Sequence, residues 1–140
     1  MSQGGDPVRD FLRRSGAPYA VIAAGLRGLV ANWERVVDLI AAGYPHGLDD
    51  YLNDMDGRQL LENALDVAPA ELREEALVRV READRRVRLY LVPAGRCLWG
   101  AIVAEEEGWD PERHWWYYER PAHPGPRLRE ELEGGPSRGG

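Results

Sequence analysis

Residues 18–45 read PYAVIAAGLRGLVANWERVVDLIAAGYP and carry the clearest periodic pattern in the chain. Apolar side chains recur there at steps of three or four residues, the spacing of one face of an α-helix. These side chains belong to Ile22, Leu26, Leu29, Val30, Trp33, Val36, Val37 and Ile40. Gly43 and Pro45 end the pattern, as helix-terminating residues do. The segment therefore predicts a long amphipathic helix that opens near Pro18.

Helical signals continue on both sides of this segment. Before it, Asp6 and Pro7 form a helix start, because Asp caps free amides and Pro fits the first helical position. After it, the apolar residues of 48–65 are interrupted at Gly57, which is consistent with two short helices or with one kinked helix. A further helix begins at Pro69, and its expected buried stripe is Leu72, Ala76, Val80, Ala83 and Val87.

The last third of the chain gives weaker signals. Residues 98–106 predict a short helix, and Leu128 and Leu132 predict a small terminal one. Residues 114–120 permit a helical turn or an extended segment, and their aromatic side chains favour extension.

Together these patterns predict an all-α fold, because no clear run of alternating strands occurs. We expect a single-domain bundle of four to six helices over residues 7–133. An aromatic-rich, partly extended C-terminal arm would occupy residues 109–126. Residues 1–6 are expected to be a disordered N-terminus, and residues 134–140 a flexible tail.

The amino-acid inventory excludes several kinds of chemistry. All 18 basic residues of the 140-residue chain are arginine, and lysine and threonine are absent. A Schiff-base lysine and a phosphate-loop lysine are therefore excluded. Only three serines occur, near the chain ends, which disfavours a hydroxyl nucleophile. The single cysteine, Cys97, excludes an intrachain disulfide and a multi-cysteine zinc site.

No catalytic residue, metal site or cofactor is predicted. His46, His114 and His123 lack a short metal-binding spacing. A calcium loop aligned on Gly57 fails at its first and last ligand positions.

The chain also predicts its compartment. It shows no signal peptide and no apolar stretch long enough to span a bilayer, and its lone cysteine favours the cytoplasm. The bias towards Arg, Ala, Gly and Pro suggests a GC-rich bacterial genome.

One segment carries most of the negative charge. Between Tyr44 and Asp66, six acidic residues face one basic residue, which accounts for five of the chain's six net negative charges. A solvated, helix-capping face is the plainer interpretation. The functional one is docking to a basic protein surface through Asp49, Asp50, Asp54 and Asp56.

A second segment concentrates the aromatic residues. Six of the chain's twelve aromatic side chains lie within residues 99–118. They are either packed over the helices or partly turned outward as a binding surface. The outward candidates are Trp115, Trp116, Tyr117 and Tyr118.

Two other sites stay open as alternatives. A small enzyme or small-molecule-binding protein would have a pocket between the bundle and the aromatic arm, lined by Asp50, His114, Trp115 and Tyr117. A nucleic-acid binder would use a strip of arginines on one helical face, at Arg81, Arg85 and Arg88. Interleaved acidic residues favour a salt-bridged solvent face for that strip.

The sequence LDDYLND at 48–54, followed by WWYY at 115–118 and by Pro121, resembles a group of small uncharacterised bacterial proteins. The resemblance covers roughly residues 19–133, in the general style of toxin-immunity proteins. It implies a bacterial, cytosolic, helical protein and carries over no catalytic residue. The function we expect is a non-enzymatic protein-binding module, most concretely an immunity-like inhibitor of a cationic toxin.

Overall fold

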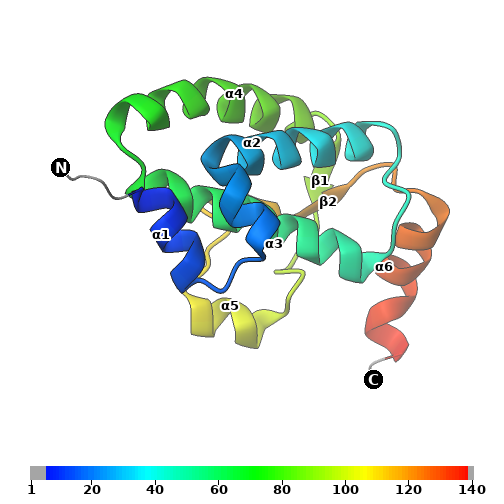
Figure 1. Cartoon of the computed structure of the whole chain (residues 1–140). Helices are drawn as coiled ribbons and strands as arrows, with labels where there is room; N and C mark the ends of the chain where they lie inside the picture. Colours follow the sequence, from blue (N-terminus) through cyan, green and yellow to red (C-terminus); the bar gives the residue numbers. More distant parts are fainter. Residues whose placement is uncertain (1–5, 139–140) are drawn as a thin grey trace.

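The predicted long helix forms α2, Tyr19–Ala41, and α2 packs against both α3, Leu48–Val67, and α4, Ala70–Arg88. The computed structural model describes residues 6–138, with the side chains of residues 6–134 (Figure 1). Short helix α1, Pro7–Arg14, lies across α2 and α3. The prediction of an all-α helical bundle is confirmed.

Burial of one face of α2 holds this bundle together. Seven of its eight predicted stripe residues are buried, and Ile22 is partly buried. The buried stripe of α4 is also as predicted, except that Leu72 is only partly buried. Each fully buried Val, Leu or Ile side chain contributes roughly 1.5–3 kcal/mol relative to exposure. The choice left open for residues 48–65 is resolved as one helix, α3, with Gly57 inside it.

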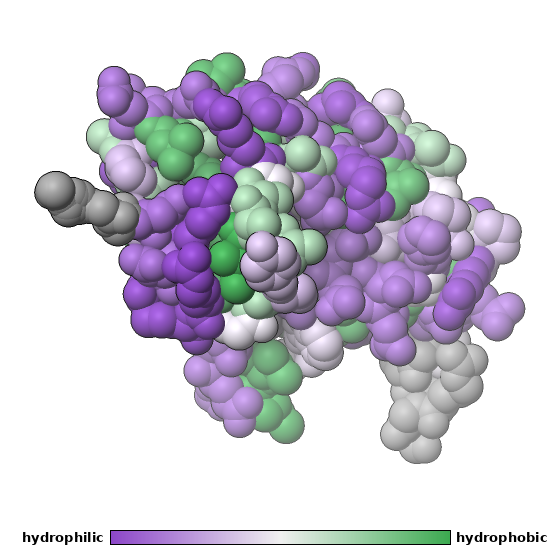
Figure 2. Space-filling model, in the orientation of Figure 1, coloured by the Kyte–Doolittle hydropathy of each residue, from purple (hydrophilic) through white to green (hydrophobic). Residues whose placement is uncertain are grey.

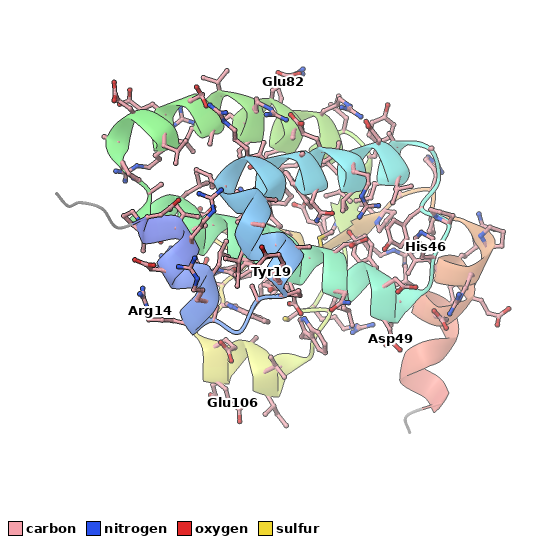
Figure 3. The ribbon with its side chains drawn as sticks, in the orientation of Figure 1. Arg14, Tyr19, His46, Asp49, Glu82 and Glu106 are labelled. Atoms are coloured by element: carbon pink, nitrogen blue, oxygen red, sulfur yellow. The ribbon has the colours of Figure 1, made fainter. Side chains whose placement is uncertain are left out.

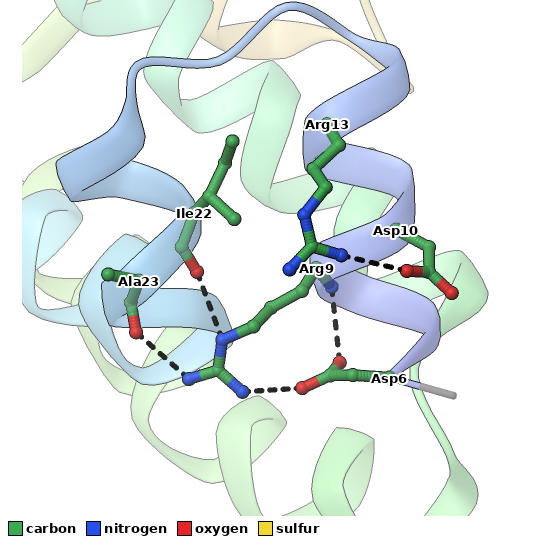
Figure 4. Close-up of polar contacts among 6 residues, drawn as sticks. All are labelled: Asp6, Arg9, Asp10, Arg13, Ile22 and Ala23. Atoms are coloured by element: carbon green, nitrogen blue, oxygen red, sulfur yellow. Dashed lines mark hydrogen bonds and ion pairs between the residues drawn. The ribbon is translucent and has the colours of Figure 1, made fainter. Parts of the chain in front are cut away.

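Helix α2 is kinked at Gly25, which the apolar pattern does not reveal. Gly25 has φ 65° and ψ −156°, a conformation that favours glycine. The Arg9 guanidinium of α1 reaches across to the kink, with Nε 3.1 Å from the Ile22 carbonyl oxygen and Nη2 2.9 Å from that of Ala23 (Figure 4). Asp6 accepts from Nη1 of Arg9 at 2.5 Å. Arg9 thus satisfies carbonyl groups that the kink removes from the helical pattern.

The rest of the chain packs against α3 and α4. It consists of β1, Leu91–Pro93, α5, Ala101–Glu107, the 3-10 turn η1, Trp115–Tyr117, β2, Glu119–Pro121, and α6, Pro126–Arg138. Of these elements, η1 and α6 contact α3, and β1 contacts α4. Figure 1 shows α5 on the side of α3 that faces away from α4.

Strands β1 and β2 form a two-stranded antiparallel sheet in which Val92 pairs with Arg120. The sequence predicts extension near β2 but neither β1 nor the pairing of the two strands, because each strand has three residues and the pairing is non-local. Residues 114–120 contain both predicted alternatives: the helical turn η1 comes first, and the extended strand β2 begins after it. Helix α6 includes residues that the sequence assigns to the tail, and residues 1–5 and 139–140 lie outside the described chain.

One buried arginine fixes the aromatic arm to the bundle. The Arg58 side chain of α3 is 4 % exposed and lies with its Cζ 4.4 Å from the ring centroid of Trp116. Its Nε and Nη2 donate to Asp84 of α4 at 3.1 and 2.7 Å, and its Nη1 donates to Glu62 at 2.9 Å. Trp33 of α2 donates to the same Asp84 carboxylate at 2.9 Å. This network joins α2, α3, α4 and η1 in one place.

Between residues 6 and 138, no helix combines the length and the apolar character needed to cross a membrane.

Candidate functional site

A shallow groove of about 430 Å³ runs between α3 and the segment that carries α5 and η1. We call it the Asp56 groove. From α3 it is lined by Asp56, Gln59, Leu60 and Asn63, and from the opposite side by Trp99, Val103, Glu107, Trp109 and Tyr117. Two of these nine residues are acidic and three are aromatic, and none is basic.

Asp56 sits among the aromatic residues and holds two of them in place. Its Oδ1 accepts a hydrogen bond from the Tyr117 hydroxyl at 2.8 Å and another from Trp99 Nε1 at 3.0 Å. Burial, and then the Asp56 carboxylate, raise the pKa of Tyr117. The Tyr117 hydroxyl therefore stays protonated and donates. Both of these hydrogen bonds use Oδ1, which leaves Oδ2 for a further donor.

The aromatic rings form the wall of the groove. Trp109 stacks on Tyr117 with ring centroids 3.8 Å apart and an interplanar angle of 16°. Trp99 is 39 % exposed, and its hydrogen bond to Asp56 orients its ring at the rim. Aromatic faces attract cations, and the rings that a cation can reach here are Trp99 and the partly buried Trp109, because Tyr117 is 1 % exposed and stacked against Trp109.

Gln59 lines the groove close to Asp56 and contains one unsatisfied polar atom. Its Nε2 donates to Asn63 Oδ1 at 3.0 Å, whereas its Oε1 is buried and has no hydrogen-bond partner among residues 6–134. A buried carbonyl oxygen without a donor costs free energy, and a group in the groove reaches this oxygen only if the Gln59 side chain moves. The groove therefore offers the carboxylates of Asp56 and Glu107 beside aromatic rings, which together suit an organic cation rich in N–H donors.

The predicted partner-binding residues do not all gather at this groove. Asp56 and Tyr117 line it, whereas Asp49 (Figure 3) and its neighbour Asp50 are exposed at the beginning of α3. Trp115 and Trp116 are buried, at 8 % and 2 % exposure. An arginine side chain packs on each tryptophan: Arg88 Cζ lies 4.6 Å from the Trp115 ring centroid, and Arg58 Cζ lies 4.4 Å from that of Trp116.

Tyr118 is half-buried and donates to the backbone oxygen of Trp109 at 3.1 Å. It therefore contacts Trp109, which lines the groove, but does not line the groove itself.

The residues of the alternative pocket are also dispersed. Tyr117 lines the Asp56 groove, whereas Asp50 lines a separate polar hollow of about 230 Å³ together with His46 and Asp54. His114 accepts from the backbone N–H of Asp110 at 3.2 Å through Nδ1 and packs edge-on against Trp116. Within the described chain, no group of three or more histidine, cysteine or acidic side chains is placed to hold a metal ion.

The Asp54 carboxylate accepts a hydrogen bond from within the protein. Its Oδ2 accepts from the Tyr44 hydroxyl at 2.5 Å. Burial raises the pKa of Asp54, and this effect exceeds the opposing effects of the Tyr44 hydrogen bond and Arg35.

We expect Asp54→Asn to raise the free energy of unfolding near neutral pH. A carboxyl with a raised folded-state pKa favours the folded state in acid and loses that contribution as the pH rises through its pKa. Asparagine still accepts the Tyr44 hydrogen bond but carries no charge to desolvate. Urea unfolding as a function of pH checks this: the advantage over wild type shrinks towards about pH 4. A constant difference at every pH would contradict it.

Several groove residues escaped the sequence prediction. Gln59 and Asn63 carry a signal that was available, because they lie three and seven residues after Asp56 and so share its helical face. Trp99 and Glu107 come from another element, and only the tertiary fold brings them to α3.

Comparison with known proteins adds no relative from which a residue's role can be transferred. No protein-family model matches the chain, and neither a curated protein nor a solved structure matches it.

Proposed function

We propose that this chain is a non-enzymatic protein-binding module of the bacterial cytoplasm that receives an arginine of a basic partner in the Asp56 groove. The single observation that carries the proposal is the Asp56 carboxylate set among Trp99, Trp109 and Tyr117. An inhibitor of a cationic toxin is the most concrete form of such a module.

An arginine matches the groove better than any other side chain. Its guanidinium presents five N–H donors and stacks on aromatic faces. Asp56 Oδ2 supplies an acceptor, and Glu107 adds a second negative charge. A cation over an aromatic face contributes about 0.5–2 kcal/mol, and arginine and tryptophan are enriched among the residues that dominate interface energies.

The exposed acids of α3 support the same function from outside the groove. Asp49, Asp50 and Asp66 are exposed on the helix that carries Asp56. Charges at the edge of an interface mainly raise the association rate and contribute less to the lifetime of the complex. A basic partner is thus attracted by these acids and held by the groove.

Binding of a small organic cation is the second candidate function, because the groove lies between the bundle and the aromatic arm and has the same acceptors and rings. Its shallow form favours a side chain of a protein over a free small molecule, since small-molecule sites usually enclose most of the ligand.

Nucleic-acid binding has less support from the structure. Arg85 is paired with Glu82 at 2.5 Å, and Arg88 is paired with Glu119 at 3.0 Å. Neighbouring Arg79 and Arg86 are paired with Glu34 and Asp38 of α2. Phosphate contacts would have to displace these carboxylates.

Calorimetric titration with a hexa-arginine peptide tests the proposed function. We expect saturable binding that Asp56→Asn weakens about tenfold, since hydrogen bonds to a charged group contribute roughly 1.5–3 kcal/mol. Asparagine can still accept from Tyr117 and Trp99, so the groove keeps its shape. Hexa-citrulline, the neutral counterpart, should not bind.

Asp49→Asn is the matched control, because it removes the same charge from an exposed position of α3 outside the groove. Its effect on affinity should stay within about twofold. Equal losses in the two variants would show that net charge, and not the groove, attracts the peptide.

A further inference from the structure

A second hollow of about 300 Å³ adjoins the Asp56 groove. It lies between α2 and α3, and most of its lining is apolar. Its walls include Ala20, Val21, Ala24 and Leu29 of α2 and Leu60 of α3. Leu60 also lines the Asp56 groove, and Gly57 of the hollow directly follows Asp56 in the chain. The two depressions are therefore neighbours that share one leucine side chain as a wall.

The kink of α2 and a set of small residues explain why this hollow is empty of side chains. Gly25 redirects the first part of α2. Around the bend, a Cβ atom on Gly28 would come within 2.3 Å of the Ala24 Cβ, so a larger residue does not fit there. On the facing helix, Gly57 likewise adds no side chain to fill the space.

The surface around the beginning of α2 is unusually apolar for an exposed region. Tyr19, the first residue of α2 and the neighbour of Ala20, is 84 % exposed (Figure 3). In Figure 2, pale and green atoms cover this part of α2, and purple atoms border them over α1. Apolar patches with a polar border are typical of protein interaction sites.

We propose that the partner segment carries a bulky apolar side chain beside its arginine, and that the hollow between α2 and α3 receives this apolar side chain. The inference rests on the proposed function, because the arginine occupies the Asp56 groove. The groove lining is acidic, whereas the hollow lining contains no charged residue. A segment with one cationic and one apolar side chain is complementary to this pair of surfaces.

The shared wall sets the spacing of the two partner residues. Residues three or four positions apart on a helix have Cβ atoms about 5–6 Å apart, so two such side chains of one segment can lie on the two sides of Leu60. The apolar residue is therefore expected within four positions of the arginine. A few well-packed buried residues, with arginine and aromatic residues enriched among them, supply most of the affinity at interfaces.

Selection from a random twelve-residue peptide library displayed on phage tests this inference. Wild-type protein should enrich peptides with a Leu, Ile, Phe, Met or Trp within four positions of an arginine. Ala20→Trp fills the hollow, and peptides selected on it should keep the arginine and lose the neighbouring apolar residue. Ala31→Trp is the matched control, because Ala31 is an exposed α2 residue outside the hollow. It should select the same peptides as wild type.

The outcomes separate the two proposals. Arginine enrichment without a nearby apolar preference, or an unchanged preference on Ala20→Trp, overturns the inference and leaves the proposed function standing. Absence of arginine enrichment on the wild-type protein overturns both. Circular dichroism spectra and melting temperatures of the two tryptophan variants verify that each is folded before selection.

Discussion

The Arg58→Met protein is expected to lose about 3–5 kcal/mol of unfolding free energy, the cost of removing one partner from a buried ion pair. Asp84 accepts two hydrogen bonds from Arg58, and without them its carboxylate stays in a site where its side chain is 19 % exposed. The Trp116 ring also loses the guanidinium that packs on it. Urea unfolding followed by tryptophan fluorescence measures the loss.

Two further variants show whether the network itself is responsible. Arg85→Met removes an arginine from an exposed pair with Glu82, and its effect should be a small part of the Arg58→Met loss. Adding Asp84→Leu to Arg58→Met removes the unpaired carboxylate and should recover part of the stability. Equal effects of Arg58→Met and Arg85→Met would contradict a structural role for Arg58.

Gly25→Ala is expected to reduce the free energy of unfolding by about 1–3 kcal/mol, the usual cost of a strained backbone conformation. An alanine must either adopt φ 65° and ψ −156° or straighten α2. Its Cβ would also lie 3.3 Å from Arg9 Nη2, which is closer than an ordinary contact. Thermal unfolding measures this effect.

Gly57→Ala provides the opposite case for comparison. Gly57 lies inside α3 without a positive φ, and a Cβ there would meet Asn32 at 3.6 Å, an ordinary contact. Alanine is better than glycine in a helix interior by about 0.5–1 kcal/mol, so this variant should gain stability. A gain in both variants would show that the kink is not required.

The difference between these two glycines shows what the sequence alone predicts. The apolar periodicity of α2 is local, and it correctly predicts the helix and its buried face. At the kink, Arg9 of another helix binds the carbonyl oxygens of Ile22 and Ala23, and nothing in the local pattern reveals that contact. The pairing of β1 with β2 depends in the same way on residues about thirty positions apart.

The acidic segment shows a similar limit. Its six acids suggest one charged surface, yet three of them bind groups within the protein. Asp54 binds Tyr44, Asp56 binds Tyr117 and Trp99, and Glu62 binds Arg58. Counting charges predicts that acids are concentrated in this segment, and only the fold shows which of them bind groups within the protein and that Asp56 also lines a groove.

The most direct test of the central claim is a ¹H–¹⁵N NMR titration with the hexa-arginine peptide. The five tryptophan side chains supply separate indole N–H signals at known positions in the fold. We predict a saturable shift of the Trp99 signal, because its N–H donates to Asp56 at the rim of the groove, and no comparable shift for buried Trp33. Shifts confined to backbone amides around Asp49 and Asp50, with Trp99 unchanged, would contradict the account.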